Sequence, residues 1–452
     1  MISINSYLLA NKPKILKDLC QFLSIPSVST QSEHKQDMFH CAHWLTRYLK
    51  SIGLSKTRIY QTKGHPVIYG EWQSQENKKT LIIYGHYDVQ PAEPLEKWKT
   101  PPFSPKVKNE KIFARGADDN KGQLFANIWA IKYYLENYKK LPVNIKLLIE
   151  GEEESGGKNL EPFIKKHKDL LCADLGLISD SSMLSKKQTS LTYGVRGIVY
   201  FEIEVTGPKQ DIHSGTYGGI VQNPTNALAQ IISRTQNENG DLLIPGIYRN
   251  VRILAKEEKD MIGNQIKKDQ LKRETGVSEL IGDRNLGVEE IVGGKPSLDV
   301  HGIWGGFRKQ GEKTIIPDMV TCKLSIRTVP NMTVKETAAL FTEYIQNIKP
   351  RGVKVNVKVI SSCETYLLDY HHPLLETAGD AIYKGFGIFP KFSLEGGSIP
   401  APTLFKKYLN LETILMGYGL PDDNLHGPNE KMDLSQIWKG IKTTVSFFNL
   451  IK

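Results

Sequence analysis

The stretch from Leu147 to Gly157 constrains the fold of this chain more than any other. A short apolar run over residues 145–149 leads directly into four acidic residues within five positions, and a Ser-Gly-Gly turn follows. A short, bounded apolar run is typical of a buried strand, so the acids are predicted to lie at the carboxyl edge of a sheet, where open α/β sheets bind ligands. Carboxylates this close repel one another unless a cation lies among them. A solvated acidic loop is the alternative interpretation of this stretch alone.

The length and composition of the chain favour a globular protein of two domains. The 452 residues exceed what one hydrophobic core usually holds, and 40% of them are hydrophobic. No apolar run approaches the roughly 18 residues that span a bilayer, and the N-terminus lacks the pattern of a secretory signal. The five cysteines are scattered and show no CxxC spacing. We therefore expect reduced thiols in a cytoplasmic protein and no thiolate zinc site.

The formal net charge of +10 raises the question of a nucleic-acid partner. The lysines and arginines are, however, spread along the whole chain and do not form a basic block. A basic balance of this kind favours solubility over affinity for nucleic acid. The sequence therefore predicts neither a nucleic-acid nor a membrane partner.

The pattern of strands and helices predicts an α/β fold with an inserted domain. A first helix is expected to open near Pro13. Strands are predicted over residues 67–72 and 80–85 and a helix over 121–138, after which the strand at 145–149 closes a β-α-β unit. This order predicts a mixed, mostly parallel sheet flanked by helices.

The hydrophobic pattern of the sequence changes beyond Asp180. Alternating strands and separate helices there predict a smaller, inserted α+β domain. We expect the catalytic domain to comprise residues 1–192 and 373–452, and the inserted domain residues 193–372. The stretch 235–295 is polar and poorly patterned, and the sequence does not indicate its role.

Histidines and acids follow several of the predicted strands and turns. His86 and Asp88 come directly after the strand at 80–85 and point the same way, so that one can bind a metal while the other orients the imidazole. Each feature alone has an ordinary interpretation, such as a packed histidine or a helix cap. The candidate ligands at these ends are His86, one of the adjacent acids Asp118 and Asp119, one of the pair Glu153 and Glu154, Asp180 and His426. This set, without thiols, is typical of two divalent ions that share a carboxylate.

Several phrases of the sequence resemble a known family. They are Tyr84-Gly85-His86-Tyr87-Asp88-Val89-Gln90-Pro91, Arg115-Gly116-Ala117-Asp118-Asp119-Asn120-Lys121-Gly122, Glu150-Gly151-Glu152-Glu153-Glu154-Ser155-Gly156 and Asp211-Ile212-His213-Ser214-Gly215. These phrases are similar to those of the M20 metallopeptidases, and most similar to the cytosolic non-specific dipeptidase and carnosinase group. The matches run, in family order, from about residue 20 to about residue 445.

The resemblance implies a zinc-peptidase-like catalytic domain with two Zn²⁺ ions per subunit, for which Mn²⁺ and Co²⁺ are alternatives. It implies one role for each matching position. Asp119 would bridge the ions, His86 and Asp180 would complete one site, Glu154 and His426 would complete the other, Glu153 would be the general base, and Asp88 would orient His86. The family also has a cis peptide after the bridging aspartate, which would fall at Asp119–Asn120. Asp118 matches a position where the family varies, and no role is assigned to it.

The resemblance further implies a homodimer in which the inserted domain serves as a lid or dimerisation domain and completes the partner's site. His213 would reach the partner subunit's site in trans and stabilise the oxyanion. Arg327 and Thr314 match positions that hold the free C-terminal carboxylate of a substrate, Ser398 matches a further carboxylate contact, and Asn226 is another candidate donor.

The expected function is a dinuclear metal-dependent hydrolase that cleaves the amide bond of dipeptides by means of a metal-bridged hydroxide and the Glu153 base. An N-acyl-amino-acid deacylase, a desuccinylase or a carboxypeptidase of the same family remains an alternative, and the side-chain preference stays open. A binding protein without catalysis would require a vacant position among the expected ones, and none is vacant. A serine hydrolase is disfavoured because the sequence contains no GxSxG elbow.

Overall fold

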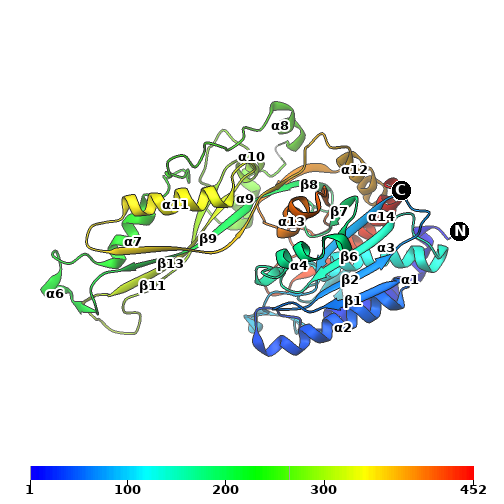
Figure 1. The fold of residues 1–452 in the computed structure, drawn as a ribbon, viewed down its shortest axis with the longest axis horizontal. Helices are drawn as coiled ribbons and strands as arrows, with labels where there is room; N and C mark the ends of the chain where they lie inside the picture. Colours follow the sequence, from blue (N-terminus) through cyan, green and yellow to red (C-terminus); the bar gives the residue numbers. More distant parts are fainter. Residues whose placement is uncertain (1, 264) are drawn as a thin grey trace. The chain divides into compact units, whose positions relative to one another are not determined.

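The computed structural model describes residues 2–263 and 265–452, which fold into two compact units (Figure 1). The first unit comprises the chain up to Tyr193 together with Leu368–Ser393 and Pro400–Lys452. The second comprises Gly194–Leu367 and the short segment Leu394–Ile399. The second unit is thus formed by one long insertion into the first unit and by one short segment nearer the C-terminus.

A nine-stranded mixed sheet has most of its strands in the first unit, and they form the centre of that unit. Its order is β1-β2-β6-β3-β7-β17-β8-β15, and β16 also pairs with β8. The strands are β1 (Lys56–Tyr60), β2 (Val67–Trp72), β3 (Thr80–His86), β6 (Asn144–Glu150), β7 (Leu175–Ile178), β8 (Ser190–Val195), β15 (Tyr366–Leu367), β16 (Lys391–Glu395) and β17 (Thr413–Leu415). The central strands β6, β3, β7 and β17 are parallel, so their carboxyl ends meet at one edge. Every residue of β3 from Leu81 to His86 is buried, because helices cover both faces of the sheet.

The helices of the first unit follow the α/β pattern that the sequence predicts. They are α1 (Ile4–Leu23), α2 (Lys35–Ser51), α3 (Lys121–Tyr138), α4 (Leu160–Lys166), α5 (Lys168–Leu171), α12 (Pro373–Phe386), α13 (Pro400–Leu409) and α14 (Leu434–Leu450). Helix α3 packs on β3 and against α14, while α13 packs on β7 and β17. A separate three-stranded sheet, in the order β18-β5-β4, is built from Lys431–Asp433, Lys111–Phe113 and Lys106–Lys108.

The expectation that the first helix opens near Pro13 is wrong. Helix α1 begins at Ile4, where the Ser3 hydroxyl caps it by accepting a hydrogen bond from the Ser6 N–H at 3.2 Å. Pro13 lies inside the helix and leaves the carbonyl four residues earlier without its usual partner. That carbonyl belongs to Leu9, whose residue is 73% exposed, so water can satisfy it.

The second unit is an antiparallel sheet with helices on one face. The sheet order is β11-β13-β9-β14, built from Ser297–Gly305, Met319–Thr328, Gly197–Thr206 and Lys354–Cys363. Alternate residues of β9 enter a core that α7 (Pro224–Ser233) and α11 (Val334–Ile348) complete. The stretch 235–295 contains three short helices, α8 (Lys256–Ile262), α9 (Lys268–Thr275) and α10 (Val288–Gly294). The predicted fold class, a mixed α/β sheet domain with a smaller α+β part, is confirmed.

Among the described residues, we find no helix with the length and apolar character needed to cross a bilayer.

Gly122, in the first turn of α3, provides a test of how tightly the preceding loop is packed. A Cβ atom at this position would lie 1.9 Å from the Ala117 carbonyl oxygen, a backbone atom that cannot move aside cheaply. We expect Gly122→Ala to lower the free energy of unfolding by about 2 kcal/mol or more. Urea denaturation measures this change.

Gly302 is the matched control, because a Cβ there would meet no atom within 4 Å. Gly302→Ala should leave the unfolding midpoint nearly unchanged. Equal stability of the Gly122 variant and the wild type would show that the loop relaxes freely.

Candidate metal centre

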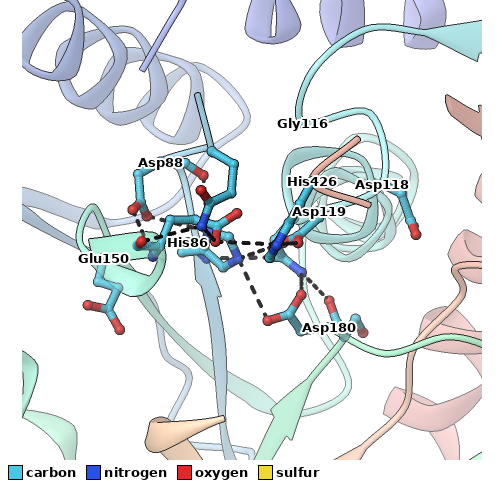
Figure 2. Close-up of polar contacts among 12 residues, drawn as sticks. His86, Asp88, Gly116, Asp118, Asp119, Glu150, Asp180 and His426 are labelled. Carbon is cyan, nitrogen blue, oxygen red and sulfur yellow. Dashed lines mark hydrogen bonds and ion pairs between the residues drawn. The ribbon is translucent and has the colours of Figure 1, made fainter. Parts of the chain in front are cut away.

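The candidate ligands all come from the first unit and reach one place from the carboxyl ends of its strands. His86 is the last residue of β3, and Asp180 lies two residues after β7. Glu154 lies in a short 3-10 turn, Glu153–Ser155, that follows β6. Asp119 precedes α3, and His426 lies in the loop before β18. Figure 2 shows His86, Asp119, Asp180 and His426 directed toward one another.

Asp119 lies between two groups of ligands. Its Oδ1 is 3.1 Å from the His86 Nε2, and its Oδ2 is 3.0 Å from the His426 Nε2. The His86 Nε2 is also 3.7 Å from Asp180 Oδ2, and the His426 Nε2 is 3.4 Å from Glu154 Oε2. Within each group the ligand atoms lie within 4.8 Å of one another. One carboxylate therefore offers one oxygen to each of two potential metal positions.

The electrostatics of this cluster fit a bound cation. Among the described residues, the ion pairs of Asp119, Glu154 and Asp180 involve only histidines and no lysine or arginine. Burial raises the pKa of Glu154 well above its usual value and that of Asp180 to about 6, because the charged forms lose hydration and face one another. The buried His86 Nε2 has no well-formed hydrogen bond. Imidazole nitrogens and carboxylate oxygens are the donors that divalent transition metals accept.

Asp88 connects the two ligand groups. Its Oδ1 lies 3.3 Å, and its carbonyl oxygen 3.1 Å, from the His86 Nδ1, so a hydrogen on Nδ1 would leave Nε2 free to bind a metal. The other carboxylate oxygen accepts a hydrogen bond from the backbone N–H of Glu154 at 3.0 Å. Both His86 and Asp88 are fully buried. One carboxylate thus fixes an imidazole of the first group and the backbone of the second.

Glu153 lies beside the ligands. Burial raises the pKa of its carboxyl group well above the usual value, His86 opposes this effect, and Asp180 and Glu154 add to it. The raised pKa moves the carboxyl group toward the range in which it can exchange protons near neutral pH.

The peptide bond between Asp119 and Asn120 is cis, as the resemblance implied. The Asn120 side chain donates hydrogen bonds to the Ser179 carbonyl at 2.6 Å and to Asp180 Oδ1 at 2.8 Å. Asn120 therefore connects the loop of Asp119 to the segment that carries Asp180.

The remaining candidate residues lie in the second unit. His213 is exposed, and its Nδ1 accepts hydrogen bonds from the backbone N–H groups of Gly215 at 3.0 Å and Thr216 at 3.3 Å. An accepting Nδ1 leaves the hydrogen of the neutral ring on Nε2. Thr314 lies next to His213, because the Thr314 carbonyl accepts a hydrogen bond from the Ser214 N–H at 3.1 Å.

Arg327, near the end of β13, donates from Nη1 to the Ser398 hydroxyl at 2.8 Å. The structure thus brings together Arg327 and Ser398. Asn226 is exposed in the first turn of α7, and among the described residues no hydrogen bond joins it to His213, Thr314, Arg327 or Ser398.

A buried ion pair behind the ligands was not predicted from the sequence. Arg115 and Glu430 are 1% and 0% exposed, and their Nη1 and Oε2 atoms are 2.8 Å apart. Glu430 also accepts the N–H groups of Gly116, Asp118 and Asp119 at 2.9–3.2 Å.

The Nη2 of Arg115 donates to the carbonyl oxygens of His426 and Pro91, both at 3.0 Å. The ion pair therefore holds three segments, those of Asp119, of His426 and of Pro91, which lies near Asp88. Gln90 gives further support by donating to Glu154 Oε2 at 2.8 Å. The sequence signal was a lone arginine among small residues, which does not indicate its partner.

A sheet whose carboxyl edge gathers two histidines and two further carboxylates around a shared aspartate defines a protein of the metal-dependent hydrolase class. The model of peptidase family M20/M25/M40 matches residues 82–449, and the chain belongs to this family. It is therefore a metallopeptidase, a hydrolase that acts on peptide bonds with divalent metal ions.

Known proteins similar to this chain include dipeptidases and a carboxypeptidase. Cys-Gly metallodipeptidase dug1 of Schizosaccharomyces pombe is 35% identical over 447 residues, which cover 95% of this chain and 94% of the relative. The structure of human carnosine dipeptidase 1 has a TM-score of 0.87 at 30% identity and covers 99% of this chain and 98% of that chain. The M20 family metallo-carboxypeptidase Sso-CP2 from Sulfolobus solfataricus has a TM-score of 0.88 at 34% identity, over 96% of this chain and 98% of that chain.

The Arg115–Glu430 ion pair yields a prediction about metal affinity. Arg115→Lys keeps the charge but cannot reach Glu430, His426 and Pro91 together, because lysine lacks the guanidinium fork. We expect the affinity for Zn²⁺ to fall by about 10- to 100-fold, since outer contacts orient the ligands. Competition with a chromophoric chelator measures it.

Lys407→Ala is the matched control, because Lys407 forms an exposed ion pair with Glu161. It should leave the affinity for Zn²⁺ unchanged. Wild-type affinity in Arg115→Lys would show that the ion pair supports only the fold.

Proposed function

We propose that this chain is a dipeptidase that uses two Zn²⁺ ions per subunit and cleaves dipeptides with a free C-terminal carboxylate. The observation that carries the proposal is the position of Asp119, whose two oxygens face different imidazoles at 3.1 and 3.0 Å. Similarity to a Cys-Gly metallodipeptidase and to a carnosine dipeptidase supports the dipeptide substrate.

Each proposed metal position has its own ligands besides Asp119. His86 and Asp180 would hold one ion, and Glu154 and His426 the other. When bound, such ions polarise the scissile carbonyl and allow water to lose a proton near neutral pH. Mn²⁺ and Co²⁺ accept the same donors and are the alternatives to Zn²⁺.

The protein's own groups would move the proton and orient the ligands. Glu153 takes the proton of the attacking water and returns it to the leaving amine, a task that suits a carboxyl group with a raised pKa. Asp88 keeps the His86 Nε2 directed at the metal position through its contacts with Nδ1.

The second unit would supply the substrate contacts. Arg327 presents a guanidinium group, the side chain suited to a bidentate grip on the C-terminal carboxylate, and its hydrogen bond to Ser398 restricts its orientation. Thr314 and Asn226 are further candidate donors. His213, with its hydrogen on Nε2, would donate to the oxyanion of the partner subunit's site in a homodimer.

The five cysteines are free, which suits the reducing environment of the cytoplasm that we propose for this protein.

The carboxypeptidase alternative has less support, because Sso-CP2 matches this chain with a TM-score of 0.88 but the curated relatives that match most of the chain include several dipeptidases. Both activities need the same grip on a C-terminal carboxylate. They differ in the room left for residues on the amino side of the scissile bond, which peptide length tests directly.

Substitution of Glu153 tests the assigned reaction. Glu153→Gln should reduce kcat for Cys-Gly and β-Ala-His by about 10³-fold or more while the Zn²⁺ content stays at two per subunit, because the base is not a ligand. Metal analysis beside a rate assay measures both quantities. Near-normal turnover would assign the base elsewhere.

The wild-type enzyme should cleave these dipeptides in preference to tetrapeptides and N-acetyl amino acids. Preferential release of C-terminal residues from tetrapeptides would instead favour the carboxypeptidase.

Mixing two inactive variants tests the contribution in trans. His213→Ala mixed with Glu153→Ala should regain about a quarter of wild-type activity after subunit exchange, because half of the dimers are mixed and each has one intact site. A steady-state dipeptide assay measures the recovery.

The control is a mixture of Asp119→Ala with Glu153→Ala. It should stay inactive because each change damages the site of the subunit that carries it, so a mixed dimer has no intact site. Absence of recovery in the His213 mixture, despite exchange shown by mass spectrometry, would place His213 in its own subunit's site or outside the reaction.

A further inference from the structure

The small sheet of the first unit concentrates lysines on one of its faces. Strands β4 and β5 pair in an antiparallel register that sets Lys106 opposite Phe113 and Lys108 opposite Lys111. Paired residues, and residues two apart on one strand, share a face. These four side chains therefore project on the same side, and two of the positive charges lie directly opposite each other. An arrangement of like charges of this kind is unfavourable unless an anion lies between them.

A hollow of about 380 Å³ lies at this face. Its volume falls within the range of small-molecule sites, about 300–1,000 Å³. The residues that line it are basic, amide, hydroxyl or aromatic, and none is acidic: Lys99, Thr100, Lys106, Lys108, Asn109, Lys111, Phe113 and Asn429.

The lysines of the hollow are poorly neutralised. Among the described residues, Lys99, Lys106 and Lys108 form no ion pair, and Lys111 approaches only Asp422, at 4.0 Å. Lysines on an edge strand such as β4 also discourage pairing with other chains. That role accounts for Lys106 and Lys108, but it does not account for the convergence of Lys99, Lys111 and two asparagines on the same hollow.

We propose that this hollow, which we term the lysine pocket, binds a small phosphate-bearing anion. Ammonium groups bind phosphate oxygens as point charges, and the amide and hydroxyl groups of Asn109, Asn429 and Thr100 can add neutral hydrogen bonds. The half-buried ring of Phe113 supplies the one aromatic surface of the lining. Inorganic phosphate would use the charges and these hydrogen bonds, whereas a nucleoside monophosphate would also place its base against this ring.

The lysine pocket shares a wall with the segment that carries His426. The Asn429 Oδ1 accepts the backbone N–H of Lys99 at 2.7 Å, and its Nδ2 donates to the Lys97 carbonyl at 2.8 Å. The next residue, Glu430, is the buried partner of Arg115. An anion in the pocket would therefore contact a segment that positions a proposed metal ligand, although the pocket contains none of the residues assigned to the reaction.

Calorimetric titration of the Zn²⁺-loaded enzyme with inorganic phosphate and with AMP tests the proposal. We expect saturable binding of both, weakened about tenfold or more in Lys106→Ala/Lys108→Ala because two charged contacts are lost. If the natural ligand is a nucleotide, Phe113→Ala should weaken the binding of AMP but not that of phosphate. If the natural ligand is phosphate itself, the variant should bind both as the wild type does. Both lysines are exposed, so the variant should unfold at the wild-type temperature.

The matched control is Lys354→Ala/Lys358→Ala, which removes two exposed lysines from the edge strand β14. This variant should bind phosphate and AMP with wild-type affinity. No binding at millimolar concentrations, or binding that Lys106→Ala/Lys108→Ala leaves unchanged, would overturn the proposal, and the latter would indicate that phosphate binds at the metal centre.

Lysine acetylation followed by mass spectrometry locates the anion independently. Phosphate should slow acetylation of Lys106, Lys108 and Lys111 severalfold and leave Lys354 and Lys358 unaffected. Equal protection of all five lysines would show general screening of charge and would contradict a site.

Discussion

The mutual repulsion of partly buried carboxylates at the carboxyl edge of the main sheet is the constraint on which the rest of this structure depends. Asp119, Glu154 and Asp180 approach one another with only two imidazoles among them. Burial and the neighbouring negative charges raise the pKa values of Glu154 and Asp180. Divalent cations remove this cost, so the same arrangement that is unfavourable for the protein alone is suited to hold metal ions.

The contacts behind the ligands show how the fold keeps such an arrangement in place. Asp88 joins an imidazole of one ligand group to the backbone of the other, and Asn120 joins the loop of Asp119 to Asp180. Arg115 and Glu430 form a buried ion pair, and each also binds backbone groups of the loops that carry Asp119 or His426. A buried ion pair is costly to desolvate, and these additional hydrogen bonds offset that cost.

The positions of the positive charges indicate a candidate anion site that the net charge alone does not reveal. The net charge of +10 arises from lysines and arginines spread over the chain, and it did not by itself predict a ligand. The register of β4 and β5 nevertheless gathers Lys106, Lys108 and Lys111 on one face, beside Lys99 from another segment. Local concentration of charge, and not the overall balance, therefore distinguishes a candidate anion site from an ordinary basic surface.

The sequence by itself determined the fold class, and its resemblance to the M20 family selected the five candidate ligands. The apolar runs that lead to His86 and to the acids from Glu150 to Glu154 mark the ends of two strands. The spacing of apolar residues along a strand or helix follows from local geometry. The sequence did not determine the start of α1, because a proline inside a helix depends on whether the freed carbonyl reaches water.

Only the tertiary structure decided which groups support the ligands. Arg115 and Glu430 are 315 positions apart, and nothing local to either residue indicates the other. The two oxygens of Asp119 likewise acquire different partners only when the loops of His86 and His426 meet. Pairing across such separations results from packing of the whole unit, whereas strands and turns are encoded in a few consecutive residues.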